Sequence, residues 1–388
     1  MKNVLSWIFI IFLIVSLFNN CLNNSVKKHV QKEKDFINYL RQAYSSGDAS
    51  KWPKPILDPE SISSFVEIGH LLDNQFPADN QYSPEKVLLG KTLFFDPRLS
   101  KSDQIACASC HDPELAWSDN RTFSFGHNRQ PGTRNAMTIL NVAYAKSLFW
   151  DGRSNSLEQQ SEMPIQDEKE MGGHIDIAAD KIAKIKSYGV LFENAFGDRK
   201  VTKDRISKSI AAFERTVKST PSKFDQFIDG KSALYTDDEI MGLHLFRTKA
   251  QCINCHNSGY FSNNRFENIG TSLLGEKGED LGRFRVTKNP EDAGRFRVPG
   301  LREVSRTGPY FHNGSMADLS EVIRFYSNGN PEHSQKRMTV HKGTVLHSGK
   351  SGMVRMLELS EQEISQLEAF LRTLSSKSEK VVIPELPE

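Results

Sequence analysis

Apolar residues recur at three- and four-residue intervals in several parts of this chain. Two such stripes are Ile206, Ile210, Phe213 and Val217, and Ile364, Leu367, Phe370, Leu371 and Leu374. This spacing places side chains on one face of a helix. Alternation of apolar and polar positions, which is typical of strands, is scarce. The pattern therefore predicts a mainly α protein.

Further helices are indicated at other places. Ile182, Ile185 and Tyr188 have helical spacing, and residues 32–44 and 319–326 form two more candidate segments. Thr236 with Glu239, and Ser360 with Glu363, have the spacing of a capping box, so helices are expected to begin there.

Polar stretches divide these helices into groups. Residues 25–60 are polar and charged and include Trp52-Pro53-Lys54-Pro55, so we expect a spacer, while 257–300 and 328–352 are expected to be long loops. The predicted organisation is an N-terminal extension at 22–82, a first domain at 83–235, a second at 236–378 and a tail at 379–388. Domains of about 150 residues are ordinary in size.

The first residues have the pattern of an export signal. Val4–Phe18 is almost entirely apolar and follows Lys2. As a helix this stretch would be about 22 Å long, short of the ~30 Å needed to cross a bilayer. Cys21 suggests a lipoprotein signal at 1–21, cleaved before an acylated cysteine, although Asn20 is larger than the usual residue there. A plain cleaved signal and an uncleaved anchor are the alternatives.

Composition narrows the class of partner. The formal net charge is +2, and 25% of residues are charged. This balance is ordinary for a globular protein and gives no case for nucleic-acid binding. Contact with a membrane is expected only through the lipid anchor.

Two copies of Cys-x-x-Cys-His carry the strongest chemical signal. They are Cys107, Cys110 and His111, and Cys252, Cys255 and His256, set 145 positions apart. In this pattern two thiols bond to the haem vinyl groups and the imidazole becomes an iron ligand. A zinc site or a redox dithiol is the alternative. Four of the five cysteines are used in this way, which leaves no pair for a disulfide. Covalent haem attachment nevertheless indicates a protein outside the cytoplasm.

Segments around these motifs resemble the bacterial di-haem cytochrome c peroxidase family, which includes MauG. The resemblance covers about Leu89 to Leu374. It lies in Leu93–Ser100, Gly132–Asn135, Phe149–Arg153, Glu170-Met171 and Gly308–Gly314. It implies two cytochrome c-like domains, each with one covalent haem c, and an active haem in the N-terminal domain.

The resemblance also implies catalytic roles. Glu170 matches the family's acid–base glutamate, Gln160 its distal glutamine, and Trp150 the tryptophan between the haems. Other interpretations remain open, because Glu170 lies in the charged run Asp167–Glu170, which is typical of a solvated surface, and Trp150 would also suit a core.

The resemblance also implies distal iron ligands. His127 lies sixteen positions after His111, the offset at which the family's classical peroxidases carry a removable ligand to the first haem iron, and Gly126 and Gly132 could supply backbone freedom. A surface histidine and an open first haem are the alternatives. Tyr326 stands where the family's peroxidases carry a ligating Met, and where MauG carries Tyr. Tyr326 as a core residue, Met316 and Met338 are the alternatives.

The resemblance implies a calcium ion between the domains, at positions matching Asn135, Thr307 and Pro309. Oxygen donors of this kind suit a hard cation. His312 and Arg153 also lie in the matching motifs and are candidates for propionate contacts or buried hydrogen bonds. The second domain contains a group of arginines that could face haem propionates, an acidic donor protein or solvent. They are Arg283, Arg285, Arg295, Arg297, Arg302 and Arg306.

Three functions follow. The first is a peroxidase that reduces hydrogen peroxide with electrons from a small cytochrome c or cupredoxin. The second is a MauG-like oxidase that modifies a partner protein, and the third is a pure electron-transfer cytochrome. We expect the protein in the periplasm or outer cell envelope, anchored through Cys21, and a homodimer is consistent with the family.

Overall fold

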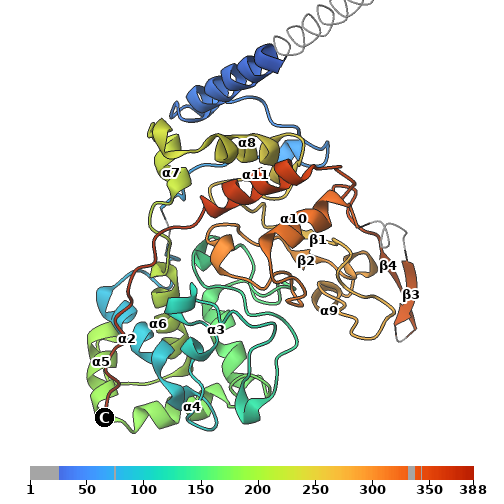
Figure 1. The fold of residues 1–388 in the computed structure, drawn as a ribbon. Coiled ribbons are helices and arrows are strands. Elements are labelled where there is room, and N and C mark those ends of the chain that lie inside the picture. The colour runs from blue at the N-terminus through green and yellow to red at the C-terminus, as the bar shows by residue number, and fades with distance from the viewer. Residues whose placement is uncertain (1–25, 74–75, 331–336, 342) are drawn as a thin grey trace, which may run out of the picture.

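The computed structural model describes residues 26–73, 76–330, 337–341 and 343–388. Residues 26–44 form a helix that projects from the body (Figure 1). The other helices are α2 (Pro84–Phe95), α3 (Leu157–Gln166), α4 (Ile175–Ala183), α5 (Lys186–Phe196), α6 (Lys203–Thr216), α7 (Lys223–Ile228), α8 (Asp237–Arg247), α9 (Phe284–Thr287), α10 (Leu319–Ser327) and α11 (Glu361–Arg372). The strands are β1 (Phe266–Glu267), β2 (Phe296–Arg297), β3 (Arg337–His341) and β4 (Thr344–Ser348). The predicted mainly α class is confirmed.

The helices pack around two separate apolar cores, seen in Figure 1 as a lower and an upper group. In the lower group α2 packs on α6, and Leu89, Phe94 and Ile210 are almost fully buried. In the upper group α8 packs on α11, where Leu243, Phe246 and Phe370 are buried. Each core lies beside one Cys-x-x-Cys-His motif, because Cys107 packs against the first and Cys252 against the second.

Several predicted helix starts are confirmed. Ser360 and Glu363 form a capping box at the start of α11, and Thr236 and Glu239 form one at α8. The pattern at Ile182–Tyr188 was only partly right. Ile185 is extended, with φ −90° and ψ 109°, so α4 ends and α5 begins there. Both helices bury their stripe in one core, and the apolar spacing therefore does not reveal the corner.

Residues 37–68 are not the spacer that their polarity predicted. Leu40, Tyr44 and Trp52 are buried in the second core. The backbone N–H of Ile56 donates to the Arg247 carbonyl at 2.9 Å, and the N–H of Asp58 donates to Asn254 Oδ1 at 2.7 Å. Widely spaced apolar side chains are enough to dock this segment.

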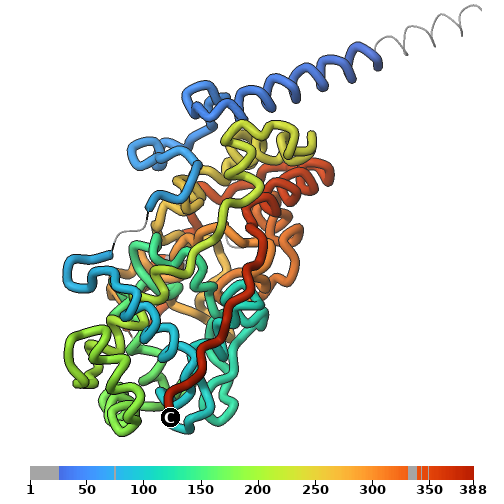
Figure 2. The backbone as a smooth tube through the Cα atoms, turned by 90° about the vertical axis from the view of Figure 1, so that its left-hand side faces the viewer, coloured from blue at the N-terminus to red at the C-terminus, as the bar shows by residue number. Residues whose placement is uncertain are grey.

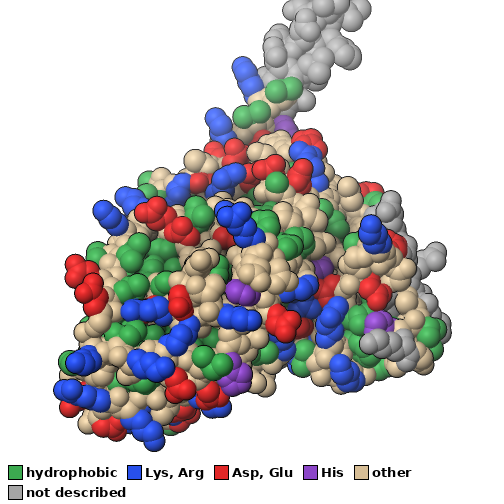
Figure 3. Space-filling view, turned by 90° about the horizontal axis from the view of Figure 1, so that it is seen from below, with side chains coloured by type: hydrophobic (Ala, Val, Ile, Leu, Met, Phe, Trp, Pro, Cys, Tyr) green, Lys and Arg blue, Asp and Glu red, His purple; other side chains and the backbone are tan. Residues whose placement is uncertain are grey.

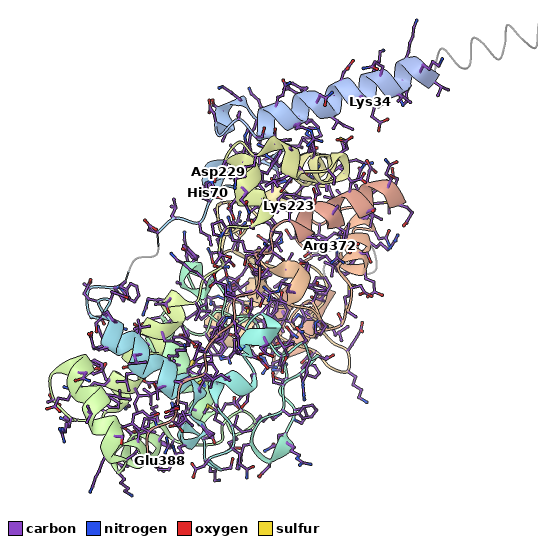
Figure 4. All side chains as sticks on the ribbon, turned by 60° about the vertical axis from the view of Figure 1, so that its left-hand side comes forward. Lys34, His70, Lys223, Asp229, Arg372 and Glu388 are labelled. Atoms are coloured by element: carbon purple, nitrogen blue, oxygen red, sulfur yellow. The ribbon has the colours of Figure 1, made fainter. Side chains whose placement is uncertain are left out.

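The cores also divide the chain differently from the predicted domain boundaries. Phe224 and Phe227 of α7 pack in the second core, although they fall within the predicted first domain. The C-terminal tail returns to the first group and ends beside α5 (Figures 2 and 4). There Ser187 Oγ donates to the Glu388 carbonyl at 2.8 Å.

The loop predicted at 328–352 contains an antiparallel hairpin, in which Val340 pairs with Val345. Its strands are short, and Leu346 alone among its described side chains joins a buried cluster, so alternation is weak. The predicted signal and Cys21 lie outside the described residues. Among the described residues no helix is long and apolar enough to cross a membrane. Acidic and basic side chains alternate over the lower face (Figure 3), in keeping with the small net charge.

Candidate haem-binding site

The two attachment motifs adopt the same local structure. Short 3-10 turns at Cys107–Ser109 and Cys252–Asn254 carry them. The N–H of His111 donates to the Cys107 carbonyl at 3.1 Å, and the N–H of His256 donates to the Cys252 carbonyl at 2.9 Å. All four cysteines are free thiols. The turn places two thiols and one imidazole on a single short loop, as haem attachment requires.

The two imidazoles are oriented by backbone carbonyls. His111 Nδ1 lies 3.2 Å from the Trp117 oxygen, and His256 Nδ1 lies 3.0 Å from the Phe261 oxygen. A donor at Nδ1 leaves Nε2 as the free acceptor, which suits metal ligation. Burial lowers the pKa of both rings, that of His256 to about 4, which favours the neutral imidazole.

One continuous cavity of about 1120 Å³ joins the two motifs. Its lining includes Cys110 and His111 from the first motif and Cys252, Cys255 and His256 from the second. Burial raises the pKa of the thiols, that of Cys110 to about 11, which is expected of side chains in an apolar cradle. The donor set and its common cavity fit two haems held by thioether bonds and axial histidines.

Gln160 and Glu170 line the same cavity. Gln160 belongs to α3, and Glu170 follows it in a turn where its N–H donates to the Asp167 carbonyl at 3.1 Å. Burial, assisted by the Asp167 charge, raises the pKa of Glu170, and Arg153 opposes this. Glu170 is therefore not the solvated residue that its charged run would suggest, and its carboxyl is easier to protonate than usual.

Trp150 lies at the junction of the two groups. Its Nε1 donates to the Asn135 carbonyl at 2.9 Å. The His312 ring is 6.4 Å from Trp150 and stacks at 3.7 Å on Phe296. Burial lowers the pKa of His312 to about 4. These aromatic side chains form a row along the cavity wall.

Tyr326 lies at the second-motif end. It projects from α10 into the cavity lining, and burial raises its pKa, as do the thiols of Cys252 and Cys255 nearby. Met316 is not among the lining residues, and the side chain of Met338 lies outside the described residues. The lining does include Met353, whose Sδ lies 3.5 Å from Ser61 Oγ. No sequence pattern singles out Met353, because it lies in a loop without a motif.

His127 is close to Glu170 but does not line the cavity. Its N–H donates to the Glu170 carbonyl at 2.6 Å, and its ring packs on Gly172, whose φ is +63°. Its Nδ1 is buried without a hydrogen-bond partner. A side chain at Gly126 would meet the Glu170 carbonyl oxygen at 2.2 Å, so glycine permits this close approach. The loop carrying His127 is thus fastened to the segment carrying Glu170.

Asn135, Thr307 and Pro309, the three residues expected to bind calcium, all line the cavity. Asn135 is buried, and its Nδ2 donates to the Arg121 carbonyl at 2.8 Å. Arg153 and His312 also line the cavity. Asp151 pairs with Arg153 at 3.2 Å, so this guanidinium is already partnered.

Two lining residues, Glu214 and Arg297, have buried polar atoms that the sequence pattern does not reveal. Glu214 on α6 is 4% exposed, and its Oε2 has no hydrogen-bond partner among the residues that the structure describes. Burial raises its pKa to about 8, with Glu158 adding to the shift and Arg215 opposing it. Arg297 on β2 is also 4% exposed and has a buried Nη1 without a partner. The apolar patterns of α6 and β2 could not reveal these two unpaired atoms.

Paired covalent attachment loops facing one internal cavity define a two-haem protein of the cytochrome c type. Residues 84–233 match the family model for di-haem cytochrome c peroxidase. The chain is 36% identical to the methylamine utilization protein MauG of Methylorubrum extorquens, over 80% of this chain and 84% of that protein. It is also 36% identical to cytochrome c551 peroxidase of Nitrosomonas europaea, over 77% and 82%. The protein belongs to the di-haem cytochrome c peroxidase family.

Solved structures agree with this assignment. A MauG-like protein associated with microbial copper homeostasis is 32% identical, with a TM-score of 0.70 over 80% of this chain and 94% of that one. The diheme peroxidase BthA of Burkholderia thailandensis, at 23% identity and a TM-score of 0.65 over 82% and 96%, shares the fold. The resemblance stated from sequence motifs is confirmed, and with it the expectation of two c-type haems.

Proposed function

We propose that this protein reduces hydrogen peroxide to water with electrons from a small redox protein such as a cytochrome c or a cupredoxin. The observation that carries the proposal is Glu170, a partly buried residue whose carboxyl has a raised pKa and which lines one cavity with His111 and Gln160. Relatives of the chain include cytochrome c peroxidases.

The reaction consumes one peroxide, two electrons and two protons and yields two waters. When bound, the haems would supply the electrons and an iron to bind the peroxide. Glu170 would take the proton from the iron-proximal oxygen and return it to the distal oxygen, which then leaves as water. A raised pKa brings the carboxyl closer to the working pH and suits it to both transfers. Gln160 would orient the peroxide, and Trp150 would relay electrons between the halves of the cavity.

Replacing Glu170 tests this role. Glu170→Gln keeps the shape and removes the titrating group, so kcat for peroxide should fall by roughly 10²–10⁴-fold. Glu168→Gln is the matched control, because this neighbouring carboxyl is exposed. Steady-state oxidation of a reduced cytochrome c by peroxide measures both variants. Equal turnover in Glu170→Gln and the wild type would reject the assigned role.

A second candidate is a MauG-like oxidase that removes electrons from a partner protein. Tyr326 favours it, because a phenolate on the second iron would stabilise the ferric state. Tyr326→Phe should alter the optical spectrum of the ferric second haem and raise its midpoint potential. Tyr310→Phe is the control, since the Tyr310 hydroxyl already donates to the Val304 carbonyl at 3.0 Å. An unaltered spectrum in Tyr326→Phe would remove the argument for this function.

Four further features belong to the same proposal. His127 would close the first haem until electrons arrive, and the loop that carries it is fastened to the Glu170 segment. Calcium would bind at Asn135, Thr307 and Pro309, and metal analysis before and after chelation tests this.

A lipid on Cys21 would hold the protein at the cell envelope, and Cys21→Ser should then release it from membranes. A homodimer stays a prediction for sedimentation.

A further inference from the structure

Arg297 differs from the other deeply buried arginines of the described chain. Arg215, Arg247 and Arg302 are each at most 8% exposed, and each pairs with a carboxylate: Glu158, Glu67 and Asp225, respectively. Arg297 is 4% exposed, and no carboxylate pairs with it among the residues that the structure describes. A buried cation without a counter-charge is strongly unfavourable, so such a group indicates an anion that belongs there.

The neighbours of Arg297 are neutral. Its Nε donates to the Phe149 carbonyl at 3.4 Å, and its Nη2 lies 3.1 Å from Met137 Sδ, a weak acceptor. Its Nη1 is buried and has no hydrogen-bond partner in the described part of the chain. The guanidinium has five N–H donors, and most of them are therefore unfilled.

The backbone fixes this guanidinium in place. Arg297 belongs to β2, where it pairs with Phe266, and its N–H donates to the Trp150 carbonyl at 2.8 Å. The side chain lines the cavity that both haem attachment motifs share. An arginine on a paired strand is held ready for a planar acceptor with two oxygens.

We propose that Arg297 binds a propionate carboxylate of one of the two haems. The propionates are the anionic groups that a haem would bring into this cavity, whereas peroxide is neutral. The proposal rests on haem occupancy of the cavity and not on which reaction the protein catalyses. The proposal selects Arg297 from the group of arginines in the second domain. Of the others, Arg302 is held by Asp225, and Arg285 is largely exposed.

The test compares haem-loaded Arg297→Gln with the wild type by spectroelectrochemistry. Loss of the cation leaves the propionate charge uncompensated, which favours ferric over ferrous iron. The midpoint potential of one haem should fall, by about 59 mV for a tenfold change in its redox equilibrium, and that of the other should move less. Arg297→Lys keeps the charge and should restore most of the loss.

Arg295→Gln is the matched control, because Arg295 is two residues away and does not line the cavity. Potentials in Arg297→Gln that equal those of this control would overturn the proposal. So would an Arg297→Lys protein shifted as far as Arg297→Gln. If Arg297→Gln fails to incorporate haem, Arg297→Lys decides alone: a near-wild-type potential supports the proposal, and a large fall rejects it.

The last measurement varies the chloride concentration, because a free inorganic anion could also neutralise the guanidinium. A potential that depends on chloride concentration in the wild type and not in Arg297→Gln would identify a free anion and reject the propionate. None of these measurements uses peroxide, so loss of peroxide turnover and loss of propionate binding are separately visible.

Discussion

At the scale of single residues, burial sets the chemistry of the carboxyls around the cavity. Glu168 and Glu170 are two positions apart in one charged run, yet Glu168 is exposed and Glu170 lines the cavity. Desolvation raises the pKa of Glu170 for that reason. A sequence pattern assigns both residues to the same solvated run, and only the family motif separated them.

Glu214 makes stability depend on pH. Its pKa is 4.5 ordinarily and about 8 in the folded protein. Between these values the unfolded chain loses this proton while the folded protein keeps it, so the contribution to stability is present below pH 4.5 and is lost as pH rises toward 8. Glu214→Gln should therefore match the wild type within about 2 °C in Tm at pH 4.5 and exceed it at pH 8.5.

Thermal unfolding of the haem-loaded protein at several pH values checks this. Glu193→Gln is the control, because the Glu193 side chain is 46% exposed. A Tm difference between Glu214→Gln and the wild type that does not change with pH would contradict the assigned pKa.

At the scale of elements, ionic contacts fasten segments that their sequence did not mark as structured. Asp225 on α7 receives two hydrogen bonds from Arg302, both at 2.9 Å, and Arg302 also donates to the Gly69 carbonyl at 2.8 Å. The pair is buried, at 2% and 6% side-chain exposure. It connects α7, the segment before Gly69 and the loop after the second motif.

Removing one partner of this pair should be costly. Asp225→Ala leaves Arg302 without its carboxylate and is expected to lower the free energy of unfolding by about 3–5 kcal/mol. Asp229, at the opposite end of α7, is the matched control, since it pairs with the half-exposed His70 (Figure 4) and Asp229→Ala should cost less than about 1 kcal/mol. Denaturant unfolding measures both, and equal effects would contradict the distinction.

The elements also show what sequence reasoning can reach. Capping boxes and apolar stripes located α8, α10 and α11 because these signals are local. The docking of residues 37–68 was missed because a few separated apolar residues, such as Leu40 and Trp52, decide it. Likewise the attachment motifs were readable, whereas Arg297 and Glu214 depend on contacts between distant segments.

At the scale of the whole molecule, one cavity unites two helical groups. The C-terminal tail strengthens this union, because Ser376 donates to Glu303 at 3.0 Å while Arg98 donates to the Pro387 carbonyl at 3.0 Å. Trp150 and His312 come from segments on either side of the junction and meet at its wall. Electron transfer between the two haems would cross this junction, so the relative position of the groups matters to turnover.

Peroxide turnover by the haem-loaded protein tests the central claim most directly. The rate of oxidation of a reduced cytochrome c is measured with the protein fully oxidised and after reduction of its second haem. We predict rapid turnover after reduction and slow turnover from the oxidised protein, since His127 would then close the first haem. Fast turnover in both states would contradict the role of His127 alone. Absence of peroxide consumption in both states would contradict the peroxidase function itself and leave an electron carrier.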